Sequence, residues 1–328
     1  MKVTYSPKDL TRAFDLCNRV APTAKGGAWD KAAGMVMDIE PSGRTTLLAT
    51  DIDTAVHVVI DAEAITDAPE ETTRWRMSSL FLAPFIKKLS KPIVVEHDGR
   101  RNALTFKSGT SKLLVPLMDA SEYPDLHMPS GAAPVDGANL VSLSERVMWA
   151  CDGNGKASGS ALSGLHADGV NIVGCRHEGM GVLDVPLDIE GPITFPAQEL
   201  IGLVKGFSDI RISADDTKVF LWLSDTDWVS SSLILAPYPA YGKLRRDTYA
   251  SSVKVNRSAL IDCLDRMAIV AAQDRADMPK VVVTISKTKF HLKLTIKDVG
   301  DSEESVTISD GPESSFQIAF SLGFLMDA

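Results

Sequence analysis

The stretch VKVNRSALIDCLDRMAIVAA (253–272) contains the pattern that organises the whole chain. A short alternating segment leads to Asn256, a residue type that favours the position just before a helix. Apolar residues then recur three and four positions apart, which is typical of an amphipathic helix with one buried face. The stretch therefore predicts a strand, a capping residue and a packed helix, in that order.

The same order occurs twice earlier in the chain. The segments VTYSPKDL (3–10) and VSLSERVM (141–148) have Ser6 and Ser144 at the position of Asn256. Leu10, Met148 and Leu260 then hold the same register in the three segments. A pattern that returns at long intervals predicts structurally similar tandem units.

A second helical pattern and a proline-containing exit also repeat. The helical pattern occurs in 77–89, 195–207 and 320–328, aligned on Leu82, Leu200 and Leu325. The segments 113–126 and 231–244 each run from a strand-like stretch into a Tyr-Pro pair, with Pro124 matched by Pro239. Alternating segments between these marks predict hairpins, for example over 93–108, 211–222 and 280–296.

We therefore expect an α+β protein of three tandem repeats, each built from βαβββ twice, with two helices packed on antiparallel sheets. The predicted domains are 1–128, 138–247 and 252–328, which we call the first, second and third repeats. By the internal repeat logic, the third is expected to be incomplete and to lack about 40 residues.

Composition limits the classes of function. The chain has 328 residues, 45% of them hydrophobic and 23% charged, which is typical of a globular protein. No apolar run reaches the length of a membrane span, and the N-terminus lacks the apolar core of a signal peptide. The net charge of −9 argues against nucleic-acid binding unless the positive charge lies on one surface.

Patterns that would indicate catalysis or metal binding are weak. Asp51 and Asp53 could hold a magnesium ion, but they follow a strand and are better explained as a turn. Cys175 beside His177 and Glu178 could indicate a thiol nucleophile, although neighbours in a strand point to opposite faces. Four cysteines are scattered singly, which favours reduced, buried thiols in the cytosol. We expect no enzyme activity, no metal and no cofactor.

The ordered set of repeats resembles the bacterial DNA sliding clamp, the beta subunit family of DNA polymerase III. The resemblance rests on LLATDIDTAVHVVI (47–60), on residues 162–187 and 195–207, and on YPAYGKL (238–244), and it covers the chain from end to end. It implies a head-to-tail homodimeric ring around duplex DNA, which acts as a processivity factor in replication. It also implies a cytoplasmic, nucleoid-associated protein with the replicative polymerase and the clamp loader as partners and no membrane contact.

In that family, helices line the channel and contact phosphate without reading bases, which suits sliding. The basic residues that the resemblance places in the channel are Lys8, Arg12, Arg19, Lys25, Lys87, Lys88, Lys205, Arg257 and Arg266. Basic inner helices in an acidic chain fit this expectation.

The resemblance also implies a pocket that binds short peptides of partner proteins. Its residues would be Leu162, Cys175, Gly179, Met180, Pro239, Lys243 and Leu244. The family has a basic residue where this chain has Gly179, although Arg176 is close in sequence. Altered or weakened peptide binding is therefore a further expectation.

Ring closure in the family pairs an edge strand of the first domain with one of the third, next to an apolar cluster. The corresponding stretches are 112–117, with Leu114, and 267–272, with Ile269 and Val270. The main hypothesis is a DNA sliding clamp. One alternative is a clamp-derived adaptor that binds partner peptides but does not encircle DNA, and a more distant one is a hydrolase that uses Cys175.

Overall fold

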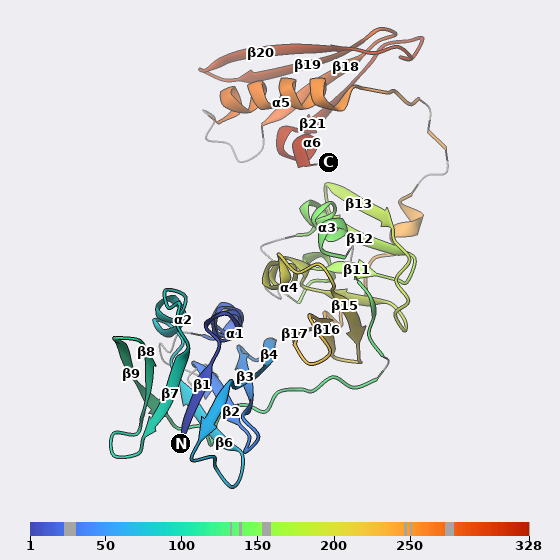
Figure 1. Cartoon of the computed structure of the whole chain (residues 1–328). Helices are drawn as coiled ribbons and strands as arrows, with labels where there is room; N and C mark the ends of the chain where they lie inside the picture. Colours follow the sequence, from blue (N-terminus) through green and yellow to red (C-terminus); the bar gives the residue numbers. More distant parts are fainter. Residues whose placement is uncertain are drawn as a thin grey trace. The chain divides into compact units, whose positions relative to one another are not determined.

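The computed structural model describes residues 1–22, 31–131, 133–137, 140–152, 159–245, 248–249, 251–272 and 279–327 (Figure 1). These residues form two compact units. The first unit comprises Met1–Ser144, Cys151–Val173 and Val182–Pro237. The second comprises Glu145–Ala150, Gly174–Gly181 and Tyr238–Ala328. The predicted α+β class with mainly antiparallel pairing is confirmed, whereas the division into three domains stays a prediction.

The first repeat contains two helices and nine strands among its described residues. In chain order they are β1 (Lys2–Tyr5), α1 (Pro7–Val20), β2 (Met35–Ile39), β3 (Arg44–Thr50), β4 (Thr54–Asp61), β5 (Ala64–Thr66), β6 (Thr73–Met77), α2 (Leu82–Ile86), β7 (Ile93–Asp98), β8 (Ala103–Ser108) and β9 (Ser111–Met118).

The rest of the chain has a similar alternation of strands and helices. Its elements begin with β10 (Val135–Asp136), α3 (Leu140–Glu145), β11 (Leu165–Ala167), β12 (Asn171–Arg176), β13 (Gly179–Asp184), β14 (Ile193–Phe195), α4 (Ala197–Val204), β15 (Arg211–Ala214), β16 (Lys218–Trp222) and β17 (Trp228–Ser232). The elements that follow are α5 (Arg257–Ala271), β18 (Lys280–Ile285), β19 (Lys289–Ile296), β20 (Gly300–Thr307), β21 (Phe316–Ser321) and α6 (Leu322–Asp327).

One long sheet joins the first and second repeats within the first unit. Its strand order is β10-β15-β16-β17-β4-β3-β2-β6-β9-β8-β7-β1-β5. The junction is the antiparallel pair β17–β4, in which Trp228 lies opposite His57 and Ser231 opposite Thr54. The Lys218 ammonium reinforces it by donating to the carbonyls of Ile52 and Asp53, at 3.1 and 2.9 Å.

Helix α1 lies against the strands of the first repeat because its apolar residues share one face. Pro7 occupies the first turn, where its missing N–H costs nothing, and Leu10, Phe14 and Cys17 are fully buried. The rings of Phe14 and Phe106 meet edge to face with their centroids 6.0 Å apart. The buried face of α1 leaves its polar face available to other contacts.

The third repeat has its own core in the second unit. Its sheet has the order β20-β19-β18-β21, and α5 packs Cys263, Leu264 and Met267 against it. The predicted cap is confirmed, because the side-chain oxygen of Asn256 accepts the N–H of Ala259 at 3.0 Å. The hairpins predicted over 93–108, 211–222 and 280–296 are also observed.

The predicted start of the helix in the second repeat is wrong. Ser144 does not precede a helix; it lies inside α3, and its hydroxyl is buried. The segment Met148–Ala150 then forms only a single 3₁₀ turn. Glycines at 153 and 155 disfavour a longer helix here. None of the helices in the described ranges is both long and apolar enough to cross a membrane.

Candidate nucleic-acid and partner interfaces

The polar face of α1 is used partly for internal contacts. Arg12 forms an ion pair with Asp227, whose side chain is almost completely buried. The other carboxylate oxygen of Asp227 accepts the N–H of Val59 at 2.8 Å. Arg12 is predicted as a channel residue, but here it joins α1 to the turn between β16 and β17. No local sequence pattern indicates Asp227 as its partner, because the two residues are 215 positions apart.

Arg19 is also engaged. Its guanidinium donates to Asp15 at 2.8 Å, one turn back along the helix, and to the carbonyl of Leu203 in α4 at 3.1 Å. The arginine side chain is nevertheless 39% exposed. It can therefore stabilise the first unit and still present positive charge to solvent.

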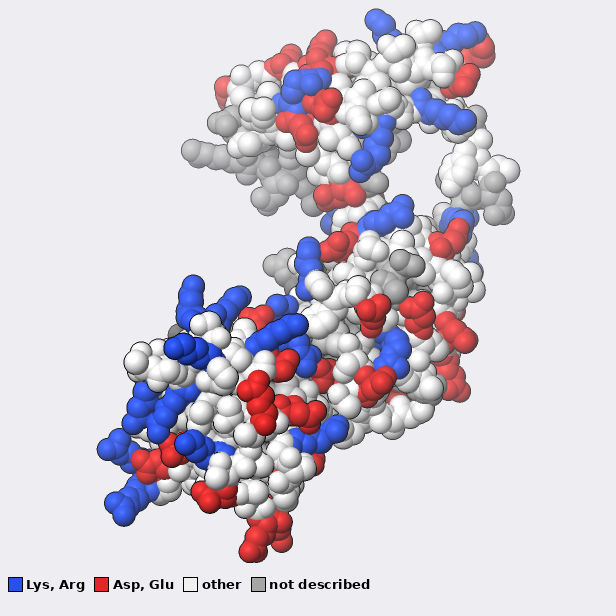
Figure 2. Space-filling model, viewed as in Figure 1, with Lys and Arg blue, Asp and Glu red and all other residues white. Residues whose placement is uncertain are grey.

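The remaining predicted channel residues are more exposed. Lys8 lies in the first turn of α1, Lys87 and Lys88 follow α2, Lys205 follows α4, and Arg257 begins α5. On the face shown in Figure 2, Lys and Arg side chains gather over the part of the first repeat that contains α1 and α2.

Two predicted channel residues stand apart from this set. Arg266 in α5 forms a two-bond ion pair with Glu304 of β20, at 2.7 and 2.8 Å. This pair holds the pKa of Glu304 below its ordinary value. Lys25 lies outside the described residues.

The residues predicted for the peptide pocket differ in exposure. Cys175 is buried, and Leu162 and Met180 are half-buried. Pro239, Lys243 and Leu244 are exposed. Leu162 belongs to the first unit and the rest to the second. Their assembly into one pocket therefore stays a prediction.

An aromatic and cationic cluster lies next to Gly179, and the sequence reasoning missed it. The Arg176 guanidinium lies 3.6 Å from the ring centre of Phe324 and 5.7 Å from that of Trp149. A β-carbon added at Gly179 would come within 3.2 Å of the Trp149 ring. Glycine at 179 thus makes room for Trp149, and Arg176 supplies a positive charge close to the position where the family has one.

The two segments predicted for ring closure differ in kind: 112–117 lies on the strand β9, and 267–272 lies at the end of the helix α5. In β9, residues 111–116 pair with β8, while β6 reaches only Leu117 and Met118. Leu114 in this segment is 37% exposed, and Ile269 on α5 is 70% exposed. Val270 is half-buried against the core of the third repeat.

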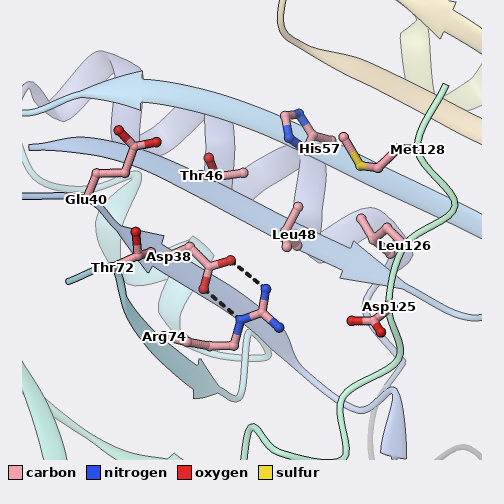
Figure 3. A pocket seen from close by; sticks show the side chains of 10 residues that line it. All are labelled: Asp38, Glu40, Thr46, Leu48, His57, Thr72, Arg74, Asp125, Leu126 and Met128. Atoms are coloured by element: carbon pink, nitrogen blue, oxygen red, sulfur yellow. Dashed lines mark hydrogen bonds and ion pairs between the residues drawn. The ribbon is translucent and has the colours of Figure 1, made fainter.

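A cavity of about 460 Å³ lies on the sheet of the first repeat, beside the segment that leaves it (Figure 3). Asp38 and Arg74 form a bidentate ion pair in its lining, at 2.7 and 2.8 Å. His57 stacks on Trp228, and burial lowers the pKa of its imidazole. The described residues that line this cavity include none of those predicted to be functional, and no serine or cysteine that could serve as a nucleophile.

Asp51 and Cys175, which were considered for metal binding and catalysis, make local structural contacts. Asp51 accepts the N–H of Thr54 at 2.7 Å, as expected of a turn. Cys175 is buried, and its thiol contacts the Arg176 carbonyl at 3.9 Å. In the described part of the chain, no cluster of three or more His, Cys, Asp or Glu side chains could hold a metal ion.

Comparison with solved structures shows that the chain has the fold of DNA polymerase III beta subunits. A DNA polymerase III beta subunit from Thermotoga maritima matches 99% of this chain and 88% of its own length, with a TM-score of 0.81 at 19% identity. A beta subunit from Streptococcus pyogenes reaches 0.85 at 16% identity, over 100% of this chain and 89% of its own. The Helicobacter pylori beta clamp bound to a DNA ligase peptide reaches 0.81 at 16% identity, over 100% and 90%.

Sequence comparisons agree with the structural ones. Residues 247–328 match the family model of the DNA polymerase III beta subunit, C-terminal domain. The beta sliding clamp of Synechocystis sp. is 25% identical over 70% of this chain and 64% of its own length. That of Synechococcus elongatus is 20% identical over 100% and 89%. The chain therefore has the fold of bacterial beta clamps, and its residues 247–328 match the C-terminal domain of that family.

Proposed function

We propose that this chain is a DNA sliding clamp: a non-enzymatic, ring-forming processivity factor that encircles duplex DNA in the cytoplasm and tethers the replicative polymerase. The observation that carries the proposal is the whole-chain fold similarity to beta clamps, at TM-scores of 0.81 to 0.85. The family match of residues 247–328 supports it independently.

The channel would attract DNA through its exposed cations rather than through base contacts. Lys8 and Arg257 lie in the first turns of α1 and α5, where a positive charge opposes the helix dipole. A cation placed there gains nothing from its own helix, which favours an external anion such as phosphate. Lys87, Lys88 and Lys205 extend the set, while Arg12 and Arg19 act mainly as internal links.

Ring closure would pair β9 of one copy with β20 of the next, head to tail. The free part of β9 carries Lys112, and Lys107 lies opposite it on β8. The edge strand β20 carries Asp301, Glu303 and Glu304. Opposite charges on two unpaired edges favour this pairing over a like-with-like one. Exposed Leu114 and Ile269 would supply the apolar contact.

The partner pocket would bind short peptides of the polymerase and the clamp loader. The crystal structure of the Helicobacter pylori clamp contains a DNA ligase peptide, which supports peptide binding by a protein of this fold. In this chain Arg176 would provide the cation of the pocket, because position 179 is glycine. The guanidinium of Arg176 is held by stacking on Phe324 and Trp149. Arg176 is four residues from Met180 in the sequence.

Retention on DNA of different topology tests the main proposal. The protein is loaded by its clamp loader onto a nicked circular duplex, which is then either left intact or linearised. A closed ring stays on the circular DNA and slides off the linear DNA. The control is Ile269→Asp, which opens the ring, so this variant should dissociate from both DNAs. Equal loss of the unmodified protein from the two DNAs would overturn the proposal.

The salt dependence of DNA association tests the predicted channel. Replacing Lys87 and Lys88 by Gln should reduce the slope of log K against log salt concentration by about 2, because each lysine that neutralises a phosphate contributes about 1 to that slope. The matched control is Lys289→Gln, an exposed cation on β19 that is not among the predicted channel residues. An unchanged slope in the double variant would remove these lysines from the interface.

A further inference from the structure

The sheet of the first repeat has a second face, on the side away from α1. Successive side chains of a strand point to opposite faces of its sheet. In β3 and β4, Leu47, Val56 and Val58 are buried on the side where α1 packs, while Leu48 and His57 are half-buried on the other side. Leu48 and His57 line the cavity of about 460 Å³ (Figure 3). The cavity therefore lies on the face opposite to the helix that is predicted for the channel.

The antiparallel register brings the lining residues of the strands together in two neighbouring rows. Asp38 lies opposite Thr46 of β3 on one side and opposite Arg74 of β6 on the other. Leu48 lies opposite His57 in the next row. A row of polar and charged side chains thus runs beside an aliphatic side chain and an aromatic ring at the base of the cavity.

One wall of the cavity is the segment 119–130, which leaves the first repeat and which we call the linker. The linker contains no helix or strand, but it is held against the sheet. The Tyr123 hydroxyl accepts the N–H of Thr50 at 3.1 Å. Further along, a ring nitrogen of His127 lies 2.7 Å from a carboxylate oxygen of Asp215. The wall is therefore already in place without an occupant.

The linker also supplies apolar side chains to the cavity. Leu126 packs partly against Phe220 and Trp228, and Met128 is 54% exposed. Figure 3 shows both side chains extending from the linker toward the strands. An exposed apolar patch with a polar rim is typical of an interaction site, and methionine adapts to apolar groups of different shape.

The charged side chains leave an excess of negative charge in the lining. The guanidinium of Arg74 donates to both carboxylate oxygens of Asp38, at 2.7 and 2.8 Å. This hydrogen bonding chiefly, and the charge of Asp125 more weakly, raises the pKa of Arg74. Glu40 and Asp125 add two further carboxylates to the lining. His57 does not compensate for them, because burial lowers the pKa of its imidazole.

We propose that this cavity binds a short basic segment of a partner protein, with arginine or lysine side chains near Glu40 and Asp125 and an apolar side chain against Leu48 and Met128. Charge complementarity favours this occupant, because an acidic or phosphorylated segment would meet more carboxylates than cations. The mixed lining favours a peptide over a simple cation, and a volume of about 460 Å³ is typical of a ligand site. Binding here requires neither DNA nor ring closure, so it is independent of the proposed function.

Fluorescence anisotropy with a labelled peptide tests the charge and the apolar contact. The probe is a peptide of about nine residues in which arginine and leucine alternate, and it is added to the chain without DNA or clamp loader. Glu40→Gln with Asp125→Asn should weaken its binding about tenfold, and Met128→Ser should weaken it about threefold. The matched control is Asp188→Asn with Glu190→Gln, which makes the same change of charge at exposed positions outside the cavity and should leave binding unchanged.

Two results of this experiment would overturn the proposal. One is an equal loss of affinity in the cavity pair and in the control pair, which would mean that only the overall charge of the chain matters. The other is equal binding of a peptide with glutamate in place of arginine, because that peptide lacks the complementary charge.

Amide chemical shifts measured by NMR locate the bound peptide. Changes are expected at 46–48, at His57 and at 125–128. Changes confined to 175–180 and 239–244 would mean that the peptide occupies the predicted partner pocket, which would overturn this proposal and leave the proposed function intact. Changes at the cavity in a chain that is lost equally from circular and linear DNA would support this proposal while the proposed function fails.

Discussion

Strands β6 and β21 have the same place in the first and third repeats, but only one of them is covered. Trp75 and Met77 on β6 are buried between neighbouring strands, while Ile318 and Phe320 on β21 keep about 40% of their surface exposed. The local patterns are similar, with apolar side chains alternating just before a helix. Burial is therefore decided by the second neighbour of the strand, which the strand's own sequence does not specify.

The largest expected effect is a core truncation at the equivalent positions. Met77→Ala should lower the free energy of unfolding of the first repeat by about 2–5 kcal/mol, because it leaves a cavity in a packed core. Phe320→Ala, studied at a concentration where the chain is monomeric, should cost much less, since its ring is already partly in water. Urea unfolding followed by Trp75 fluorescence reports the first change. Hydrogen exchange reports the second, because the third repeat has no tryptophan.

Equal costs for the two variants would contradict the comparison. That result would mean that Phe320 is as well covered as Met77 in solution.

The next effect compares two arginines that the resemblance assigns to the same surface. Arg12→Ala should destabilise the first unit by about 2 kcal/mol, because it leaves the buried Asp227 carboxylate without its cation. Arg266→Ala should give no resolvable change, since Arg266 and Glu304 form an exposed pair. Urea midpoints of the two variants measure this, and Arg12→Lys should restore part of the loss.

For DNA association the order should be reversed. Arg266→Ala should weaken retention at low salt, because it removes a cation that the resemblance places in the channel, while Arg12→Lys should bind as the parent does. A stable Arg12→Ala protein would show that the Asp227 carboxylate finds another partner.

A smaller effect compares the starts of α1 and α5. Asn256→Ala should cost about 1 kcal/mol, because it removes the side-chain bond to the Ala259 N–H. Ser6 has the equivalent position, but its hydroxyl makes no capping bond. Ser6→Ala should therefore change stability by no more than a few tenths of about 1 kcal/mol. Hydrogen exchange at the first-turn amides distinguishes the two. An equal loss in both variants would mean that Ser6 caps α1 in solution.

Local features of this fold could be predicted from the sequence, while long-range ones could not. The Asn256 cap and the hairpins depend on neighbouring residues, and they lie where they are expected. The prediction for Ser144 is wrong because it matches a capping residue in type, whereas the helix around it begins earlier, at Leu140.

The candidate interfaces show the same limit. The exposed lysines follow from helix position, but the partner of Arg12 is 215 residues away and no local pattern indicates it. The stacking of Arg176 on Phe324 likewise joins segments that are far apart in the chain. The exposure of the lysines could therefore be predicted, whereas the internal partners of the arginines could not, and the channel itself stays a prediction.

The smallest expected effect is the pH dependence of stability that comes from two carboxylates, Glu96 in the first repeat and Glu304 in the third. Hydrogen bonds from Lys107 and Arg266 hold the pKa values of Glu96 and Glu304 below the ordinary value of glutamate. Each pair therefore contributes stability that is fully present above that ordinary value and is lost as the pH falls through the lowered pKa. Both pairs lie near the surface, so acid should weaken the first and third repeats alike. NMR titration of the two carboxyl groups should give lowered pKa values, and Arg266→Gln should return Glu304 alone toward the ordinary one. A selective acid loss of the third repeat that persists in Arg266→Gln would show that the loss does not come from the Arg266–Glu304 pair.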